Sequence, residues 1–477
     1  MVSKKADGKA NIGQTIKGIV LAITTVLCVV VGFVLEPFVG LEPTGMRFLA
    51  IFIWWIVLMI TEFLPTHIAT LIACVLCILL GVPDASTMVF SQMGSSVVML
   101  IMGAFGFATG LINSGLLKRL SLLVVRAVRK TPLAQLMAFE AFNLAITPWI
   151  PAVNGKQAIM VPLGNDIAEN LGFKPHTRAF TGFFMIANIF TLIIGMCFMT
   201  GAATVMTGLA FVPYEMTWLG YLRNTAVYLI VSVVLFSLFF MFYYRPAKGE
   251  AANVVDGEAI TRNVNEQLAA MGKMGGKEIY ALVVLVVTVL MFLVGDSLGI
   301  STMAVALGAW MLMCVGGLFS PQDFMTKLMW PVLVLIGGIL GLVTLMQSTG
   351  VASWIAELCG PILAPLASNP LLLCFVLVLL VYALRFGLVS VTVTFALATA
   401  VFAGCNVDPF VYIFIILVSG MIFVLYYQNT MVIGALALTD GKVVQKDITV
   451  GAVVFTVVNL VAILASVPYW AALGMFG

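Results

Sequence analysis

The chain has 477 residues, of which 62% are hydrophobic and only 9% are charged. Ordinary globular proteins carry about a quarter charged residues, so this composition excludes a water-soluble enzyme, a disordered scaffold and a nucleic-acid binder. The net charge of +3 is small, and what matters in so apolar a chain is where its basic residues lie. Two histidines leave little for a His-based site, and the eight cysteines lie in apolar segments and imply no disulfide framework.

Eleven apolar runs are long enough to cross a bilayer, because a hydrocarbon core of about 30 Å requires about 20 apolar residues per helix. In chain order they are residues 15–36, 46–64, 66–83, 96–114, 178–198, 218–243, 279–298, 300–319, 330–349, 410–437 and 449–472. The first run lacks a small-residue cleavage site after it, so we expect a retained helix rather than a signal peptide. The sequence therefore predicts an all-α, multi-pass membrane protein.

Two further apolar stretches, residues 132–163 and 370–403, are interrupted midway by polar and small residues. The interruptions read TPWIPAVNGKQ in the first stretch and RFGLVSVTVT in the second. Irregular backbone at membrane depth is tolerated only where it is buried in protein or lines a polar cavity. We therefore expect both stretches to be re-entrant hairpins, which enter the bilayer and return on the same side.

The basic residues follow the pattern expected of a chain whose N-terminus lies in the cytoplasm. With eleven crossings, 19 of the 23 Lys and Arg residues then fall in inner segments. Arg47 and Arg223 lie near outer helix ends, and Lys156 and Arg385 fall inside the hairpin interruptions. We predict a cell-membrane protein with a cytoplasmic N-terminus and an external C-terminus, in which the polar stretch 245–278 is a cytoplasmic linker between halves.

Two segments with the same glycine pattern indicate that the halves are related. Residues 95–116 align without gaps to residues 330–351, pairing Gly103 with Gly338, Gly106 with Gly341, Thr109 with Thr344 and Gly115 with Gly350. The segment after the first copy is basic and the one after the second lacks Lys and Arg, as an inverted repeat predicts. The predicted units are an N-terminal segment with the first helix (1–44), a first repeat (45–244), the linker (245–278) and a second repeat (279–477).

The polar residues at the hairpin breaks are candidate substrate ligands. A charge at the bilayer centre costs about 2.5–3.5 kcal/mol, so Lys156 and Arg385 need a reason to be there. Arginine suits bidentate carboxylate binding and lysine acts as a point charge, although a snorkelling lysine or an arginine paired to a buried acid is the alternative. The uncharged candidates at the breaks are Asn154, Gln157, Ser390, Thr392 and Thr394, and Thr200, Asn429 and Thr430 are candidates outside the two hairpin stretches. Glu140 is interpreted as a proton-coupling carboxylate or as the partner of a basic residue.

Four segments occur in the order of the motifs of one transporter family. Residues 54–65 (WWIVLMITEFLP) are similar to a W-W-I-T-E-x-x-P signature with three or four residues inserted, and residues 114–125 resemble an interfacial helix. Residues 390–394 (SVTVT) resemble an S-N-T-x-T hairpin tip, and residues 446–470 have the character of a final helix. The chain thus resembles the divalent anion/sodium symporter family, within the ion transporter superfamily, from about residue 45 to its end.

This resemblance implies a homodimer in which a transport domain carrying both hairpins slides against a fixed scaffold. It also implies that each hairpin tip, with a paired loop in the following crossing, holds sodium and substrate carboxylates. Residues 152–156 (AVNGK), 200–204 (TGAAT) and 428–430 (QNT) stand at those positions, without the family's Ser-Asn-Thr at the first tip or its proline-asparagine in the loops. Sodium needs several oxygen ligands. These departures predict transport driven by anion exchange or protons.

The leading hypothesis is a secondary active transporter of small organic anions, di- or tricarboxylates, with elevator-type alternating access. A sodium-coupled symporter and a transporter of an inorganic anion such as sulfate or arsenite are the alternatives. A channel is disfavoured by the inverted broken hairpins, and a membrane-embedded enzyme by having only His67 and His176 as histidines. We expect no catalytic residue, metal site or cofactor, with sodium as the alternative coupling ion. The expected partners are the anion, the lipid bilayer and a second copy of the chain, and no nucleic acid.

Overall fold

The computed structural model describes residues 2–61, 63–127, 131–246, 257–387, 391–402 and 405–476. Within these ranges the chain is helical, with no β-strand and one isolated bridge between Val407 and Phe476. The prediction of an all-α membrane protein is confirmed by this helical content and by the many apolar helices. Among the predicted positions, Ser390 lies outside the described residues, as does Glu62 of the signature segment.

The described helices follow the predicted runs closely. In the first half they are α1 (Val2–Val29), α2 (Pro43–Thr61), α3 (Thr66–Leu79), α4 (Ala85–Met93), α5 (Ser96–Asn113), α6 (Leu116–Ala127), α7 (Pro132–Ile146), α8 (Val153–Asn170), α9 (Arg178–Leu192), α10 (Ala203–Leu209) and α11 (Trp218–Tyr243). They continue with α13 (Gly257–Met271), α14 (Gly276–Val294), α15 (Thr302–Val315), α16 (Pro321–Thr326), α17 (Trp330–Ser348), α18 (Val351–Ala367), α19 (Pro370–Leu384), α20 (Val391–Phe402), α21 (Pro409–Ser419), α22 (Thr430–Ala437) and α23 (Gln445–Ala472).

Eight helical segments within the described ranges are long and apolar enough to span a membrane. They are Lys17–Val34, Pro43–Thr61, Ala85–Asn113, Arg178–Cys197, Trp218–Tyr243, Gly276–Val294, Trp330–Ser348 and Gln445–Ala472. The predicted crossings at 66–83 and 300–319 form the shorter apolar helices α3 and α15. The predicted crossing at 410–437 is broken into α21 and α22, because Gly420 and the polar residues 428–430 interrupt it.

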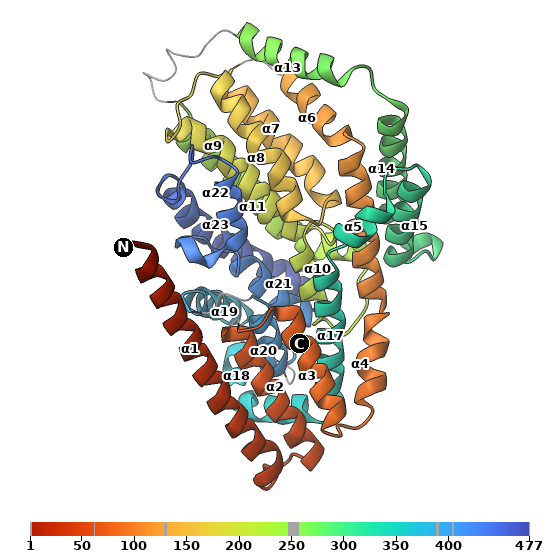
Figure 1. Cartoon of the computed structure of the whole chain (residues 1–477), viewed down its shortest axis with the longest axis vertical. Helices are drawn as coiled ribbons and strands as arrows, with labels where there is room; N and C mark the ends of the chain where they lie inside the picture. Colours follow the sequence, from red (N-terminus) through yellow and green to blue (C-terminus); the bar gives the residue numbers. More distant parts are fainter. Residues whose placement is uncertain are drawn as a thin grey trace.

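The contacts between helices divide most of them into two groups, whose members are labelled in Figure 1. In the first, which we call the scaffold, α5 packs on α15, while α17 packs on α3 and α4. In the second, the hairpin bundle, α8 packs on α9, α11 on α23, and both α19 and α20 on α21. Helices α6 and α18 contact members of both groups and connect them. The scaffold thus comprises α1–α5 and α14–α17, and the hairpin bundle α7–α11 and α19–α23.

The two halves are interleaved inside the hairpin bundle. Helices α7 and α8 flank a break that contains Pro148 and Pro151, and both pack on α9. Helices α19 and α20 flank the second break, and both pack on α21. Beyond α9 and α21 the chain is irregular and then forms a short helix, which packs on the other half. Helix α10 lies on α20 and α21, and α22 lies on α8 and α9.

The glycines that align between the halves have matching environments. A Cβ on Gly103 would come within 2.7 Å of the backbone of α15, and one on Gly338 would lie 2.7 Å from Thr70 Cγ2 of α3. Gly115 and Gly350, which follow α5 and α17, have φ angles of +77° and +73°. Glycine adopts such angles without steric cost. Gly103 and Gly338 therefore both allow the close approach of a neighbouring helix, and Gly115 and Gly350 both allow a positive φ angle.

Two boundaries differ from the sequence prediction. Helix α8 continues to Asn170 although the first hairpin was expected to end at residue 163. Pro162 lies inside it, because one proline removes a single backbone hydrogen bond and α8 still packs along α9. The stretch 245–278, expected to be a polar loop, contains α13 and the start of α14.

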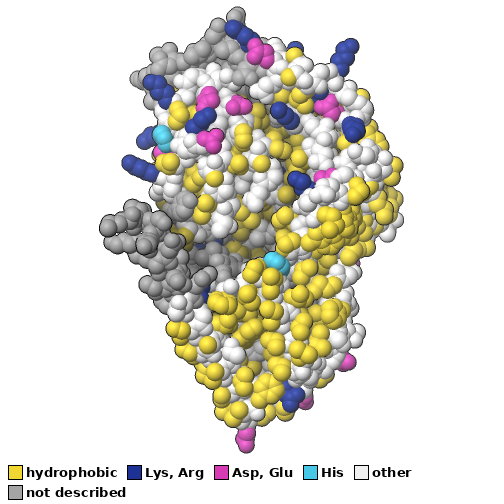
Figure 2. Space-filling view, viewed as in Figure 1, with side chains coloured by type: hydrophobic (Ala, Val, Ile, Leu, Met, Phe, Trp, Pro, Cys, Tyr) yellow, Lys and Arg dark blue, Asp and Glu magenta, His cyan; other side chains and the backbone are white. Residues whose placement is uncertain are grey.

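Charged and apolar side chains separate on the surface. Lys, Arg, Asp and Glu gather at the end of the molecule that carries α13, and hydrophobic side chains cover much of the face toward the opposite end (Figure 2). Large hydrophobic residues on α11, α14 and α23 are exposed, among them Ile230, Val283 and Val457. Outward-facing apolar residues of this kind suit contact with lipid, in keeping with a multi-pass membrane protein.

Candidate functional site

The first break is organised around Lys156, in the first turn of α8. Its ammonium group donates to the backbone oxygen of Gly201 at 2.6 Å and to that of Thr147 at 3.3 Å. Thr147 belongs to the hairpin tip, by which we mean the turn between α7 and the first turn of α8, and Gly201 belongs to the irregular segment after α9. The Lys156 side chain therefore connects these two segments. The side chain is fully buried, with 0% of its surface exposed. Two backbone oxygens therefore hold its terminal nitrogen.

Two glycines make room for this ammonium group. A Cβ on Gly195 would lie 3.3 Å from Lys156 Nζ, and one on Gly201 would lie 2.2 Å from the Gly195 oxygen. A side chain on Gly201 would collide with the backbone of Gly195, and one on Gly195 would press tightly against the Gly201 oxygen and the ammonium group. The glycines therefore allow the carbonyl-lined cradle, by which we mean the Thr147 and Gly201 oxygens around Lys156 Nζ.

Two of the three uncharged candidates of the first half, Gln157 and Thr200, are already hydrogen-bonded. Gln157 donates to Asn188 Oδ1 on α9 at 3.0 Å. The Thr200 hydroxyl donates to the Pro148 oxygen at 2.6 Å and accepts from the indole of Trp218 at 3.0 Å. Because a hydroxyl has one proton, Thr200 has no donor left for an anion in this arrangement. Asn154, in contrast, is exposed at the start of α8.

The second break repeats the arrangement with an arginine. Arg385 is the C-cap residue of α19, is 4% exposed, and donates through Nη2 to the backbone oxygen of Gln428 in the irregular segment before α22. Asn429 accepts from the backbone of Met431 at 3.1 Å and donates to the Met421 oxygen at 3.1 Å. In both halves, then, the basic residue of the hairpin donates to a carbonyl in the break of the following helix.

The remaining candidates of the second half lie on α20 and α22. Thr394 is buried and Thr392 half-buried on α20, and Thr430 is exposed at the start of α22. Helix α22 packs on α8, the helix of Asn154, Lys156 and Gln157. Helix α20 packs on α10, which starts just after Thr200. The fold therefore brings the elements that carry the predicted residues of the two halves into contact.

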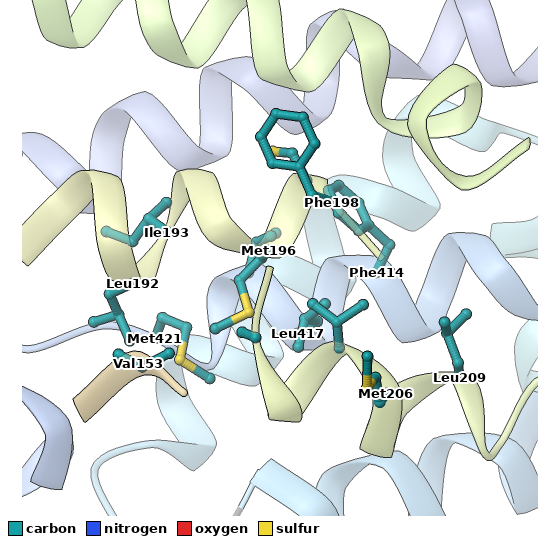
Figure 3. Packing of buried hydrophobic residues seen from close by; sticks show 14 of the residues in the cluster. Val153, Leu192, Ile193, Met196, Phe198, Met206, Leu209, Phe414, Leu417 and Met421 are labelled. Atoms are coloured by element: carbon teal, nitrogen blue, oxygen red, sulfur yellow. The ribbon is translucent and has the colours of Figure 1, made fainter. Parts of the chain in front are cut away.

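An apolar seam joins the two breaks. Val153 of the first tip, Met196 of the segment after α9 and Met421 of the segment after α21 belong to one buried cluster (Figure 3). Leu192 and Leu417, from the helices that end at these segments, pack in the same cluster. Since this seam excludes water from the backs of the breaks, the electrostatic interactions of the two cations are strengthened.

Glu140 lies apart from these cations. It is buried on α7, and its carboxylate accepts a hydrogen bond from the hydroxyl of Ser237 on α11. Its second oxygen has no partner, and no basic side chain pairs with it in the part of the chain that the structure describes. The expected basic partner is thus not among the described residues, and proton coupling stays a prediction.

A cavity of about 460 Å³ lies between the scaffold and the hairpin bundle. Its lining includes Ser96, Met199, Glu215, Asp296 and Thr344, and none of the predicted substrate ligands. The described lining residues carry two carboxylates and no Lys, Arg or His. This electrostatic environment repels anions, so the cavity is not assigned as the anion site.

Sequence reasoning missed the residues that hold the candidates in place. Asn188, Pro148 and Trp218 each contact a predicted residue, and all are far from it in sequence or lie in apolar context. The one available signal was the pair of glycines, Gly195 and Gly201, that interrupts the apolar run after α9. Helix-breaking glycines inside a membrane crossing indicate a paired loop, although not which oxygens point inward.

Comparison with known proteins places the chain in a family. A model of the sodium:sulfate symporter transmembrane region matches residues 16–476. YflS of Bacillus subtilis (strain 168), a protein proposed to transport malate, is 24% identical over 75% of this chain and 74% of its own length. Dicarboxylate transporter 1 of Spinacia oleracea chloroplasts is 24% identical over 72% of this chain and 61% of its own length. The citrate/succinate antiporter of Escherichia coli (strain K12) is 25% identical over 50% and 53%.

The fold has a solved relative as well. The YdaH transporter of Alcanivorax borkumensis, whose structure has an unusual topology, superposes with a TM-score of 0.56 over 83% of this chain and 90% of its own. At 14% sequence identity this likeness concerns the fold alone. Because the family model covers nearly the whole length, this chain belongs to the divalent anion:sodium symporter family and is a multi-pass secondary transporter of anions.

Proposed function

We propose that the chain exchanges di- or tricarboxylates across the membrane without a requirement for sodium. The relatives named for malate, dicarboxylate and citrate/succinate transport favour carboxylates as the substrate class. The antiporter among them favours exchange. The name of the matched family includes sodium and sulfate. The proposal is therefore tested against two alternatives, a sodium-coupled symporter and a transporter of an inorganic anion.

The observation that carries the proposal is the place of the two hairpin cations. Lys156 and Arg385 each donate to a backbone oxygen in the break of the following helix, at Gly201 and at Gln428. Backbone oxygens are the ligands that hard cations such as sodium prefer. A tethered ammonium or guanidinium group that occupies such oxygens supplies positive charge without a dissociable ion. This supports sodium-independent transport.

The same charges suit a substrate with two carboxylates. Lys156 uses two of its three protons on carbonyls, which leaves one for an anion. Helices α8 and α22 pack together. The N-terminus of each adds partial positive charge beside an exposed side chain, that of Asn154 on α8 and that of Thr430 on α22. We therefore place the anion near the N-termini of α8 and α22, with Asn154, Thr430 and the two cations as its principal partners and the other predicted ligands, apart from Thr200, around them.

Fixed charges also favour exchange over net uptake. Because Lys156 and Arg385 cannot dissociate, an empty site would cross the bilayer with an excess of positive charge, which is costly. A bound dianion neutralises it. In the proposed elevator, the hairpin bundle moves against the scaffold only when it is loaded, and the scaffolds of two copies form a fixed dimer.

Uptake into proteoliposomes tests this function. We expect labelled succinate or citrate to enter vesicles preloaded with unlabelled dicarboxylate, with the same rate in sodium and in choline buffers. Empty vesicles should take up little. Uptake into empty vesicles that rises steeply with a sodium gradient would identify a symporter instead. Competition by sulfate but by no carboxylate would identify an inorganic-anion transporter.

We further propose that the charged end of the molecule, near α13, faces the cytoplasm, with the C-terminus on the other side. The gathering of charged side chains at this end supports the orientation. Single cysteines introduced at Lys277 and at Gly474, in a background that lacks the native cysteines, would be labelled by an impermeant maleimide from opposite sides of the membrane. Labelling of both from one side contradicts the proposed topology.

A further inference from the structure

Trp218 lies at the point where the first break meets the scaffold. It opens α11, is 4% exposed, and its indole N–H donates to the hydroxyl of Thr200 at 3.0 Å. Thr200 in turn donates to the backbone oxygen of Pro148 in the hairpin tip at 2.6 Å. Pro148 is the neighbour of Thr147, whose oxygen accepts from Lys156. The indole therefore reaches the cradle of Lys156 through a single hydroxyl.

The ring of Trp218 makes a second set of contacts. It stacks on Trp149 of the tip, with centroids 5.6 Å apart and planes 8° apart. It also stacks on Phe292 of scaffold helix α14, at 5.8 Å and 15°. The backbone N–H of Trp218 donates to the hydroxyl of Thr302, the first residue of scaffold helix α15, at 3.2 Å. One residue thus contacts the tip and two scaffold helices.

We propose that Trp218 is a positioning residue, which holds the first hairpin tip through its indole N–H and couples that tip to the scaffold through its ring. The proposal rests on the proposed transport function. The indole N–H orients the Thr200 hydroxyl, which connects the segment after α9 to the hairpin tip. Loss of the indole N–H therefore loosens the cradle and weakens substrate binding. The ring contact with Phe292 crosses between the two helix groups, so it breaks whenever the hairpin bundle moves against the scaffold.

These two roles can be separated by substitution. Trp218→Phe keeps an aromatic ring and loses the N–H, so the KM for exchange should rise about 5-fold while Vmax stays within 2-fold, as expected for one hydrogen bond. Thr200→Val should give a similar rise and the double variant no further rise, whereas Thr200→Ser, which keeps the hydroxyl, should raise the KM less than Thr200→Val. Phe292→Leu keeps the apolar volume but removes the stack, so Vmax should change about 2- to 10-fold with KM unaltered.

Trp55→Phe is the matched control. The indole of Trp55 also donates to a threonine hydroxyl, that of Thr70, at 3.0 Å in a buried site, but wholly within scaffold helices α2 and α3. Its loss should leave KM unchanged. Equal KM effects of Trp55→Phe and Trp218→Phe would reduce the latter to a general packing defect and overturn the proposal.

Amide hydrogen exchange supplies a readout that needs no transport. In Trp218→Phe and Thr200→Val, the amides of residues 145–156 should exchange faster than in the wild type, and in Trp55→Phe they should not. If the wild type exchanges no carboxylate but the tip responds in this way, the proposed function fails and the positioning role stands. If carboxylates are exchanged but Trp218→Phe alters neither KM nor tip exchange, the positioning role is wrong.

Discussion

The two basic side chains of the breaks sit at opposite ends of helices, and the backbone treats their charges differently. Lys156 lies in the first turn of α8, where the helix N-terminus contributes positive potential. Arg385 is the C-cap residue of α19, where the helix end is negative and favours a cation by about 0.3–1 kcal/mol. Both donate to a carbonyl of the next break, but only Arg385 is also favoured by its own helix.

This difference separates structural from functional explanations. A neutral donor at position 156 would satisfy the Thr147 and Gly201 oxygens without burying a charge near a helix N-terminus. The charge of Lys156 therefore needs a use beyond local hydrogen bonding, and a bound anion provides one. Arg385 lies at the negative end of α19, so its charge also has a structural use besides the proposed contact with the anion.

Neutralising either cation should have the largest effect. Lys156→Gln and Arg385→Gln should each abolish exchange, because removing one partner of a desolvated charge interaction costs about 3–5 kcal/mol, or roughly two to four orders of magnitude in affinity. Binding and uptake of labelled dicarboxylate measure this in purified protein of normal yield. The exposed Lys327 of the scaffold supplies the control Lys327→Gln, which should behave as wild type. Wild-type affinity in a well-folded Lys156→Gln or Arg385→Gln protein rules out that residue as a substrate partner.

Shortening Lys156 should convert the cradle into a cation site. In Lys156→Ala the Gly201 and Thr147 oxygens lose their donor, and each unsatisfied buried group costs about 1–3 kcal/mol. Sodium or ammonium ions could then bind there, so part of the lost exchange should return as their concentration rises. The same ions should not rescue Arg385→Ala if its guanidinium group is mainly a helix cap. Exchange in Lys156→Ala that ignores both ions would argue against the cradle as a cation site.

Exchanging the two cations should separate their geometries. Arg385→Lys keeps the charge at the end of α19 but loses the planar fork, so the affinity should fall about 10-fold. Lys156→Arg should be inactive, because a guanidinium group is larger than an ammonium group and the side chain at this position is fully buried. Titration of binding by both variants measures the effects. Equal affinities of the Arg385→Lys and Lys156→Arg variants would mean that either basic side chain can serve in either half.

The helices could be predicted from the sequence in more detail than the contacts of the candidate site. Apolar runs placed most helices within a few residues. The four aligned pairs from Gly103 to Gly115 predict two related halves, because backbone requirements repeat when a fold repeats. The sequence did not predict that α8 extends to Asn170, because Pro162 and the polar residues after it suggest that the helix ends there. In the structure α8 continues because it packs on α9.

The site was predictable in kind but not in detail. Charges inside broken hairpins stand out because a bilayer penalises them, so Lys156 and Arg385 could be singled out from the chain alone. Their partners are backbone oxygens, which every residue has, and no sequence pattern distinguishes the oxygen of Gly201 from its neighbours. The stack of Trp149, Trp218 and Phe292 was likewise hidden, because its members are distant in sequence and each is ordinary in an apolar run.

Glu140 tests whether the first half has a second function that the second half lacks. Glu140→Gln preserves an oxygen for the Ser237 hydroxyl, so folding and exchange of anions should stay within about 2-fold of wild type, the effect of altering one hydrogen bond. If the carboxylate couples protons, a pH gradient should stimulate net uptake in the wild type and not in this variant. Equal stimulation of both proteins removes Glu140 from the coupling. Loss of exchange together with a lowered melting temperature would make it structural.

The smallest expected effect tests the equivalence of the halves themselves. Gly115 and Gly350 align in sequence, follow the aligned helices α5 and α17, and have φ angles of +77° and +73°. Alanine at such an angle costs about 1 kcal/mol, so Gly115→Ala and Gly350→Ala should lower thermal stability in detergent by small and equal amounts. Nothing lies within 4 Å of a Cβ on Gly350, and the nearest atoms to one on Gly115, in Glu278 and Met271, are 3.9 Å away. Crowding therefore adds nothing to the cost of the angle in either half. A much larger loss in Gly115→Ala would mean that this turn also supports the ion pair of Glu278 with Arg119, and hence that the first copy has acquired a structural task that its counterpart does not have.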